Sequence, residues 1–221
     1  MATNRSYNDA CGLAHALDLV GERWALLVVR ELVLGPKRYT DLRADLPGIS
    51  TNVLSHRLDE LTQSGVVRRR WLPPPAGSSV YELTEWGHEL EPIISQLGRW
   101  GARSSSRPQD AHLSATSLIL SLRTNFDAHA GDGALVSYEL RLGDDRFHAK
   151  ITEGEFEVAR GSADRPDATI EAEPVTLAAL LYGGRDLAEA VRSGDLSFRG
   201  DQAAVERFLT LFPLPEPAPA T

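Results

Sequence analysis

The sequence predicts an α+β protein with two domains, and three features of the 221-residue chain support this prediction. Helical patterns occupy most of residues 13–65 and run into two strand-like segments that end near residue 83. A second series of short strands and helices begins at residue 113. The composition also changes between the two series, since all four tryptophans precede residue 104 and all six phenylalanines follow it.

The first domain begins with helical segments separated by turn residues. Helices are predicted over Trp24–Leu34 and Tyr39–Leu46, because the Gly-Pro pair at 35–36 interrupts the pattern between them. A third helix is predicted to start after Ser50, whose side-chain oxygen can accept a hydrogen bond from an unpaired backbone N–H. It is predicted to stop at Gly65, which adopts positive φ without steric cost. The apolar stripe of this helix is formed by Leu54, Leu58 and Leu61.

Two strands are predicted after the third helix. They cover Val66–Leu72 and Val80–Leu83, and the Pro- and Gly-rich segment Pro73–Ser79 between them is predicted to be a loop. Three helices, a strand, a loop and a strand follow one another as in a winged helix-turn-helix. Taken alone, the third helix could equally be an ordinary amphipathic surface helix.

The third helix and its flanks carry the predicted contacts with double-stranded DNA. The outer face of the helix is small and polar, which suits close approach to base edges and phosphates in the major groove. The candidates for base edges are Thr51, Asn52, Ser55 and His56. The other predicted DNA-binding residues are Lys37, Arg38, Tyr39, Ser50, Arg57, Arg68, Arg70, Ser78 and Ser79. Arg57 has an alternative, which is to pair with a neighbouring acid such as Asp59 or Glu60.

The distribution of charge agrees with a DNA-binding first domain. The whole chain has a formal net charge of −8, but residues 1–103 hold 12 Lys/Arg and 12 Asp/Glu and are neutral. Within residues 37–70, seven basic residues face four acidic ones, a balance of +3. A local basic strip on a neutral domain is what phosphate contacts require, whatever the charge of the whole chain.

The predicted organisation has four parts. A DNA-binding and dimerisation domain covers residues 1–103, and a second domain covers 113–213. The Ser-, Pro- and charge-rich stretch 104–112 between them is predicted to be a linker, and residues 214–221 form a Pro-rich tail.

The second domain is predicted to hold a largely antiparallel sheet. Alternating apolar and polar residues predict strands over 134–142, 146–151, 155–160, 168–172 and 196–198. Helical spacing predicts helices over 113–129, 175–182, 187–192 and 201–212.

Composition excludes or disfavours several other classes. The chain has no apolar run long enough for a membrane span and no apolar segment behind its first residues, so we expect a cytoplasmic protein. Its single cysteine excludes an intrachain disulfide, and the scattered histidines do not have metal-ligand spacing. Motifs for a nucleophile elbow, a zinc peptidase or a phosphate-binding loop are missing. We therefore expect no enzymatic activity and no cofactor, and a pure lipid carrier would leave the basic helix unexplained.

The first domain resembles the HxlR family of bacterial winged-helix regulators over residues 7–102. The resemblance rests on the order and spacing of Cys11, Gly21–Trp24, Arg38–Leu42, Gly48–Ser50, Leu54–Leu58, Leu61, Gly65–Arg68, Tyr81–Thr84, Gly87 and Trp100-Gly101. It implies a homodimer that binds a roughly palindromic operator. It also implies that the first helix and a long helix from Glu85 to about Trp100 form the dimer contact. An apolar face on that helix is compatible with this role, although Pro92 interrupts it.

Cys11 is a candidate redox site. Several HxlR-type regulators carry an N-terminal cysteine that senses oxidants or electrophiles, and Cys11 lies at the matching place before the first helix. A reactive thiol needs access and a lowered pKa, which a helix N-terminus can provide. The alternative is that Cys11 is a small apolar residue at the dimer contact.

The second domain resembles the sterol carrier protein-like fold, a curved sheet with helices over one face. The resemblance covers about 113–213 and rests on Pro166–Ile170, Leu177–Gly183, Gly194–Asp201 and Phe208–Phe212. It implies that an apolar or amphipathic small molecule binds between helices and sheet. The predicted lining is Leu118, Leu122, Phe126, Leu177, Leu181, Tyr182, Phe208 and Phe212. These residues could instead form a filled core, and the domain could be a dimerisation module without a ligand.

The sequence therefore predicts a dimeric transcriptional regulator whose second domain senses an apolar small molecule. The alternative is a thiol-based regulator that senses oxidants through Cys11, with the second domain in a structural role. The operator, the effector and the sign of regulation do not follow from the residues.

Overall fold

The computed structural model describes residues 6–108, 111–131, 133 and 135–219. The chain divides into two units, Met1–Ile94 and Ser95–Thr221, which are described separately. Within the described residues, no helix combines the length and apolarity that a membrane crossing requires.

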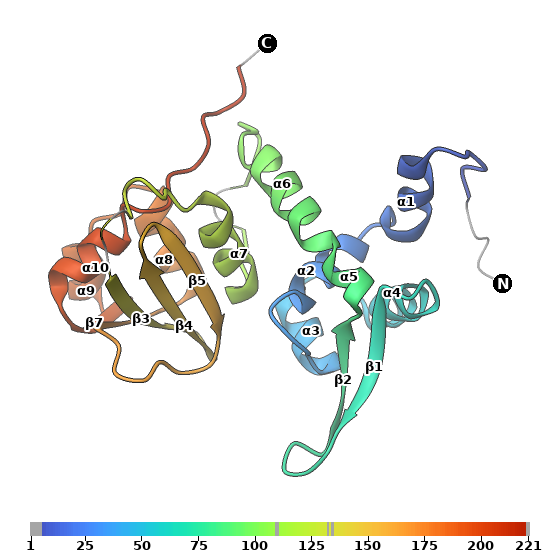
Figure 1. Ribbon diagram of the computed structural model, residues 1–221, viewed down its shortest axis with the longest axis horizontal. Helices are drawn as coiled ribbons and strands as arrows, with labels where there is room; N and C mark the ends of the chain where they lie inside the picture. The colour runs from blue at the N-terminus through green and yellow to red at the C-terminus, as the bar shows by residue number, and fades with distance from the viewer. Residues whose placement is uncertain (1–5, 109–110, 132, 134, 220–221) are drawn as a thin grey trace. The chain divides into compact units, whose positions relative to one another are not determined.

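The first unit contains helices and a β-hairpin in the predicted order (Figure 1). Its elements are α1 (Gly12–Val20), α2 (Ala25–Leu32), α3 (Tyr39–Asp45), α4 (Thr51–Gln63), β1 (Val67–Leu72), β2 (Ser78–Leu83) and α5 (Glu85–His88). Helix α6 (Leu90–Ala102) starts in this unit and ends in the second. The fold class predicted for this half, a winged helix-turn-helix, is confirmed.

The helices of the first unit pack through fully buried leucines and valines. The predicted stripe of α4 is buried, with Leu54 and Leu58 fully inaccessible and Leu61 almost so. Helix α2, with buried Val28, Val29 and Leu32, packs against both α4 and α3, and Leu42 of α3 is also buried. The burial of one face of α4 leaves its opposite face for solvent or a partner.

The hairpin projects from the helices of its unit as a wing (Figure 1). Strands β1 and β2 pair antiparallel, with Arg68 opposite Glu82 and Trp71 opposite Ser79. Ser78 and Ser79 were expected at the tip of the loop, but they belong to β2 because their backbones pair with the end of β1. On its other side β2 pairs with Lys37, which adds an isolated bridge to the hairpin.

The predicted helix from Glu85 to Trp100 is divided into α5 and α6. Pro92 lies in the first turn of α6, where its missing N–H costs no helical hydrogen bond, so the helix restarts ahead of it. Gly87 in α5 lies directly against Val66, the residue before β1. A Cβ atom there would be 2.1 Å from the carbonyl oxygen of Val66, so only glycine fits this packing.

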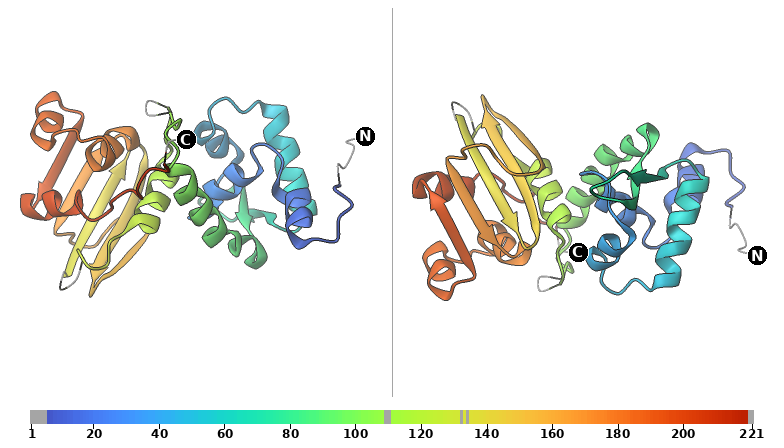
Figure 2. Two further views of the ribbon diagram at one scale, coloured as in Figure 1. Left: turned by 90° about the horizontal axis from the view of Figure 1, so that it is seen from above. Right: turned by 90° about the horizontal axis from the view of Figure 1, so that it is seen from below.

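The second unit contains a five-stranded sheet with helices packed against it (Figures 1 and 2). Its strands are β3 (Leu135–Leu142), β4 (Asp145–Thr152), β5 (Glu155–Arg160), β6 (Ala168–Ala172) and β7 (Leu196–Gly200). Its helices are α7 (Ala115–Asn125), α8 (Pro174–Tyr182), α9 (Leu187–Ser193) and α10 (Gln202–Phe208). The predicted start of the first strand at Ala134 lies outside the described residues.

The strand order is β5-β4-β3-β6-β7. Strand β3 pairs in parallel with β6, and the other neighbouring strands pair antiparallel, as expected for an antiparallel-rich sheet. Along β4, Phe147, Ala149 and Ile151 are buried while His148 and Lys150 are exposed. This alternation gives the sheet one apolar face, which the helices cover, and one polar face.

Aromatic side chains form the centre of the second core. Phe212 contacts Phe126, Phe156 and Phe208 at ring-centroid distances of 5.8, 5.1 and 4.9 Å. The last helix was expected to reach Phe212, but α10 ends at Phe208. Phe212 is nevertheless buried, because the irregular segment after the helix turns it into the core.

The predicted boundaries of the domains remain predictions. The division between the units falls within α6, whereas a linker was expected at 104–112, of which 109–110 lie outside the described residues.

The first part of the Pro-rich tail is hydrogen-bonded to the residue that follows α6. Arg103 Nε donates to the carbonyl oxygen of Glu216, and the N–H of Ala218 donates to the carbonyl oxygen of Arg103, both at 2.9 Å.

Candidate nucleic-acid interface

The outer face of α4 presents the four residues proposed for base edges. Thr51, Asn52, Ser55 and His56 are all exposed. Because the leucines on the opposite face are buried in the core, the helix cannot rotate without losing that burial. The packing therefore directs these four side chains to the surface of the unit.

The start of α4 is fixed by local hydrogen bonds. Ser50 is the N-cap, as predicted, and its side-chain oxygen accepts from the N–H of Val53 at 3.3 Å. Gly65 follows the helix with φ of 77°, as its predicted role as a stop requires.

Tyr39 joins α3 to the exposed end of α4. Its hydroxyl donates to the carbonyl oxygen of Thr51 at 2.9 Å, and Ser55 Oγ donates to the Tyr39 hydroxyl at 3.4 Å. Tyr39 therefore positions the first turn of α4, and its oxygen lies among the residues proposed to meet DNA.

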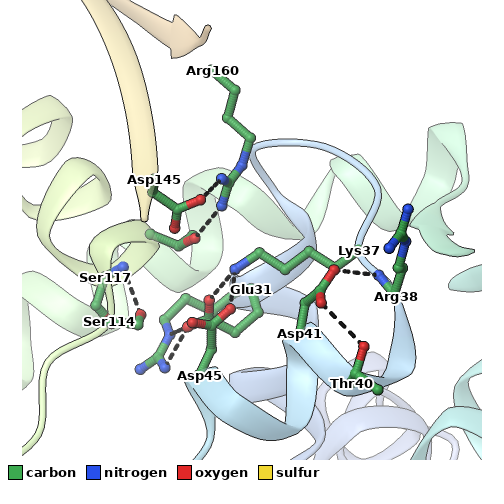
Figure 3. A network of polar contacts seen from close by, with 12 residues as sticks. Glu31, Lys37, Arg38, Thr40, Asp41, Asp45, Ser114, Ser117, Asp145 and Arg160 are labelled. Atoms are coloured by element: carbon green, nitrogen blue, oxygen red, sulfur yellow. Dashed lines mark hydrogen bonds and ion pairs between the residues drawn. The ribbon is translucent and has the colours of Figure 1, made fainter. Parts of the chain in front are cut away.

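Arg38 lies between α3 and the wing. Its backbone N–H donates to Asp41 Oδ2 at 3.2 Å, which caps the start of α3 (Figure 3). Its side-chain Nε donates to Ser78 Oγ at 3.1 Å. The Arg38 side chain is exposed, and its guanidinium has Ser78 as a side-chain partner. Arg38 is thus placed where it can contact a phosphate beside α4.

Lys37 does not face solvent, in contrast to the prediction that it contacts phosphate. Its side chain is 6% exposed, and Nζ lies 2.7 Å from Glu31 Oε2 and 2.5 Å from Asp45 Oδ2 (Figure 3). Glu31 is fully buried and also pairs with Arg30 at 2.7 Å. A buried carboxylate requires such partners. Lys37 therefore neutralises acidic side chains within the first unit and is not available to a phosphate at the proposed DNA interface.

Arg57 and His56 both pair with Glu60. The Nε2 atom of His56 lies 3.1 Å from Glu60 Oε1, and Arg57 forms an ion pair with the other oxygen of Glu60 and lies 3.6 Å from Glu22. The Arg57 side chain is 13% exposed. Of the two roles considered for Arg57, the structure shows the acid pairing, with Glu22 as an additional partner.

The wing presents arginines on both of its faces. Arg68 and Arg70 share one face and hold the two carboxylate oxygens of Glu82 at 2.7 and 2.8 Å. Burial would raise the pKa of Glu82, but hydrogen bonds from Arg70 and Arg68 hold it below its ordinary value. Both arginines remain substantially exposed, at 64% and 47%, so their outer N–H groups can meet a further anion.

Two exposed wing residues were not among the predicted contacts. Arg69 donates from Nε to Ser79 Oγ at 2.5 Å. The Trp71 side chain, two residues further along β1, is 65% exposed. Period-2 alternation of the strand places Arg69 and Trp71 on the face opposite Arg68 and Arg70. The alternation of residues along β1 could be read from the sequence, but alternation alone does not show which face of the strand is exposed.

The predicted ligand-lining residues of the second unit fall into two groups. Phe208 and Phe212 are buried in the aromatic core, with Phe126 half-buried against it, and their rings pack on one another. The second group lies on α7 and α8, which pack together. There Leu118, Leu122 and Leu177 are fully buried, and Leu181 and Tyr182 are half-buried. Both groups therefore contain half-buried residues beside fully buried ones.

Comparisons with known proteins match both halves of the chain. The model of the HxlR-like helix-turn-helix family matches residues 19–109, and that of the SCP-2 sterol transfer family matches residues 127–213. The HTH-type transcriptional regulator YvaP of Bacillus subtilis is 39% identical over 85 residues, which cover 38% of this chain and 79% of YvaP.

The protein belongs to the HxlR-like helix-turn-helix family.

Another relative, the HTH-type transcriptional regulator YodB of Bacillus subtilis, is 36% identical over 85 residues, covering 38% of this chain and 76% of YodB. The solved structure of reduced YodB has 32% identity and a TM-score of 0.39, and covers 44% of this chain and 97% of that chain. A quinone-bound structure of YodB has 32% identity and a TM-score of 0.36, and covers 40% of this chain and 93% of that chain. In this HxlR-like chain, an SCP-2-like domain follows the helix-turn-helix.

Helices α6 and α1 each carry exposed apolar side chains. Ile93, Leu97 and Trp100 recur along one side of α6 and are 57%, 48% and 73% exposed. Leu13 and Leu17 of α1 are 69% and 42% exposed. A row of exposed apolar side chains along one side of a helix, as on α6, is typical of protein–protein contacts.

Cys11 is exposed and is the N-cap of α1. The backbone N–H groups of Ala14 and Leu13, which the helix leaves unpaired, lower the pKa of the thiol from its ordinary value. The thiol therefore has both properties that reactivity requires, access and stabilisation of the thiolate.

We expect Lys37→Met to destabilise the first unit by about 3–5 kcal/mol, because it leaves the buried Glu31 carboxylate without its ammonium partner. Urea unfolding followed by tryptophan fluorescence measures this. Lys150→Met, a change at an exposed lysine of β4, is the matched control and should stay within about 0.5 kcal/mol of the parent. If Lys37→Met leaves the stability unchanged and makes the salt dependence of DNA binding shallower, Lys37 is a phosphate contact after all.

Proposed function

We propose that this protein is a dimeric, operator-binding transcriptional regulator whose second unit senses an apolar or amphipathic small molecule. The observation that carries the DNA-binding part is the exposed polar face of α4, held in place by Tyr39 and Ser50. Small polar side chains allow the backbone to approach the major groove, and Asn52 can pair bidentately with adenine. Membership of a family whose relatives are HTH-type transcriptional regulators supports this function.

The charges around α4 support docking on a duplex. Arg38 lies on one side of the helix, and Arg68 and Arg70 lie on the wing. Such cations contact phosphates and set the register of the helix, while the polar side chains of α4 read the bases. Ser78 and Ser79, at the start of β2, belong to the same proposed surface.

Dimerisation is proposed through the apolar side of α6 together with α1. An operator of two half-sites requires two copies of α4 held about 34 Å apart, one turn of DNA. Burial of Leu97 and Trp100 against a second copy would remove exposed apolar area from water, which favours association.

The second unit is proposed as the sensor because of the half-buried residues on α7 and α8. A ligand changes DNA affinity only if it binds the competent and incompetent states with different affinities. Helix α6 belongs to both units, so a ligand that alters how its second half packs acts on the proposed dimer contact.

A second candidate function is redox sensing through Cys11, which the exposed, activated thiol favours. In this alternative the second unit has a structural role. The relative YodB has been solved in a reduced form and in a quinone-bound form.

We expect Asn52→Ala to weaken operator binding about tenfold or more while changing affinity for unrelated DNA little, because it removes a base contact. Arg38→Ala should weaken binding to all DNA and reduce the slope of log affinity against log salt by about one. Fluorescence anisotropy on the protein's own upstream region and on a scrambled duplex measures both, with Gln63→Ala at the exposed end of α4 as control. Equal losses on both duplexes for Asn52→Ala would remove this residue from base recognition.

We expect Leu97→Glu to convert the dimer to a monomer at micromolar concentration, because the change places a charge in the proposed apolar contact. Sedimentation velocity reports the mass. Val191→Glu on α9, also at an exposed apolar position, is the matched control and should leave the mass unchanged. A dimer that survives Leu97→Glu would exclude this side of α6 as the contact.

We expect Cys11 to be alkylated by iodoacetamide with a midpoint at lower pH in the native protein than in urea. The backbone N–H groups that lower its pKa exist only while α1 is folded, and the chain has one cysteine, so the signal is unambiguous. The native thiolate is then present at pH values where the unfolded thiol is still protonated. Coincident midpoints in the native and the urea-unfolded protein would rule out an activated thiol. If diamide still releases the Cys11→Ser protein from its operator, the redox function of Cys11 is ruled out.

A further inference from the structure

One side chain of the proposed base-reading face is held by an acid on the same helix. His56 Nε2 lies 3.1 Å from Glu60 Oε1, one turn further along α4. Residues four apart on a helix lie on the same face, so this contact follows from the helix itself. The His56 side chain is 47% exposed, and it therefore remains accessible to DNA while one of its ring nitrogens is engaged.

Glu60 is itself held by a second partner. Arg57 Nη1 donates to Glu60 Oε2, and Arg57 Nη2 lies 3.6 Å from Glu22 in the turn between α1 and α2. The Arg57 side chain is 13% exposed and pairs with both carboxylates. Because the arginine occupies Oε2, the other oxygen of Glu60 is the one that meets His56.

The carboxylate determines which nitrogen of His56 carries the proton. An ionised carboxylate only accepts hydrogen bonds, whereas a neutral imidazole has one N–H group and one unprotonated nitrogen. The nitrogen that faces Glu60, Nε2, must therefore be the donor. Nδ1 is left with its lone pair, and none of the described residues donates to it. The imidazole consequently presents an acceptor to a ligand at this face of α4.

An acceptor distinguishes between bases in the major groove. Adenine presents the N6 amino group and cytosine the N4 amino group, and both of these donate. The N7 and O6 atoms of guanine and the O4 atom of thymine accept, so they would oppose the lone pair of Nδ1 with lone pairs of their own. A His56 ring held by Glu60 therefore suits a base that carries an amino group.

We propose that Glu60 is a positioning residue that holds His56 in the Nε2–H tautomer, so that Nδ1 accepts from an adenine or cytosine amino group of the operator. This inference rests on the proposed DNA-binding function and states what one residue of that site recognises. Arg57, which pairs with acids within its own unit, takes part by fixing Glu60.

Glu60→Gln is the most informative variant, because it keeps the shape of the side chain. The amide has one oxygen and one NH2 group, and Arg57, which only donates, can pair with the oxygen alone. The NH2 group then faces His56, so Nε2 must accept and the ring proton moves to Nδ1. Asp59→Asn removes the same charge at the neighbouring exposed position and is the matched control.

Nitrogen-15 NMR of the full chain identifies the tautomer in the absence of DNA. At alkaline pH the imidazole is neutral, and protonated and unprotonated ring nitrogens have well separated shifts. The chain has six histidines, so comparison with His56→Gln assigns the signal. We expect the Nε2–H form in the parent and in Asp59→Asn, and the Nδ1–H form in Glu60→Gln. A parent in the Nδ1–H form, or a Glu60→Gln protein that keeps the Nε2–H form, would overturn the role of Glu60.

A second measurement tests what His56 reads. A duplex that the parent selects from a random library is varied one base pair at a time, and affinity is followed by fluorescence anisotropy. The position that His56 contacts is the one at which His56→Ala no longer distinguishes the bases. On the contacted strand we expect the parent and Asp59→Asn to prefer adenine or cytosine over guanine or thymine about tenfold, and Glu60→Gln to lose or reverse this preference.

Two results would overturn base recognition by His56. The first is a preference of the parent for guanine or thymine at that position, and the second is a His56→Ala protein that keeps every preference of the parent. If the parent selects no sequence at all, the proposed DNA-binding function fails and the base contact fails with it. The NMR measurement contains no DNA, so it judges the role of Glu60 separately from that function.

Discussion

The buried ion pairs of Lys37 determine the geometry of the DNA-binding unit. The ammonium joins Glu31 of α2 to Asp45 of α3, and the backbone of the same residue pairs with Tyr81 of the wing. One residue therefore connects two helices and the hairpin. Breaking such a pair is costly, because it leaves a carboxylate in a site that water cannot reach. Arg38 and Tyr39 follow Lys37 directly, so the positions of the proposed DNA contacts derive from this cluster.

Helix α6 has two environments. Its apolar side chains Ile93, Leu97 and Trp100 are exposed, whereas Arg99 is tied to the end of α7 through Thr124 and Asn125. An amphipathic helix normally buries its apolar side against its own domain. Here hydrogen bonds from Arg99 join the second half of the helix to α7, while the apolar side chains stay exposed. The helix of the proposed dimer contact is consequently joined to α7, which carries part of the proposed sensing site.

Most elements could be predicted because their patterns are local. The limits of β5 and β6 were predicted to the residue, and α4 was located by its leucine spacing, its serine cap and Gly65. The errors occur where another interaction competes with the local pattern. Pro92 divides the expected long helix, and α10 stops short of Phe212 because that ring is buried equally well from an irregular segment.

By itself, the sequence determined the fold class of both halves, the outer face of α4 and the cap that starts it. These follow from periodicity and from residues close together in the chain. Only the tertiary structure decided which basic residues are free. Lys37 and Arg57 carry the same charge as Arg38, yet the first is enclosed by two carboxylates and the second pairs with Glu60 and Glu22. The local sequence offered Glu60 as a partner for Arg57 but could not choose between this pairing and a phosphate contact. It gave no sign that Lys37 is enclosed, because Glu31 and Asp45 are brought to its ammonium by the packing of α2 and α3.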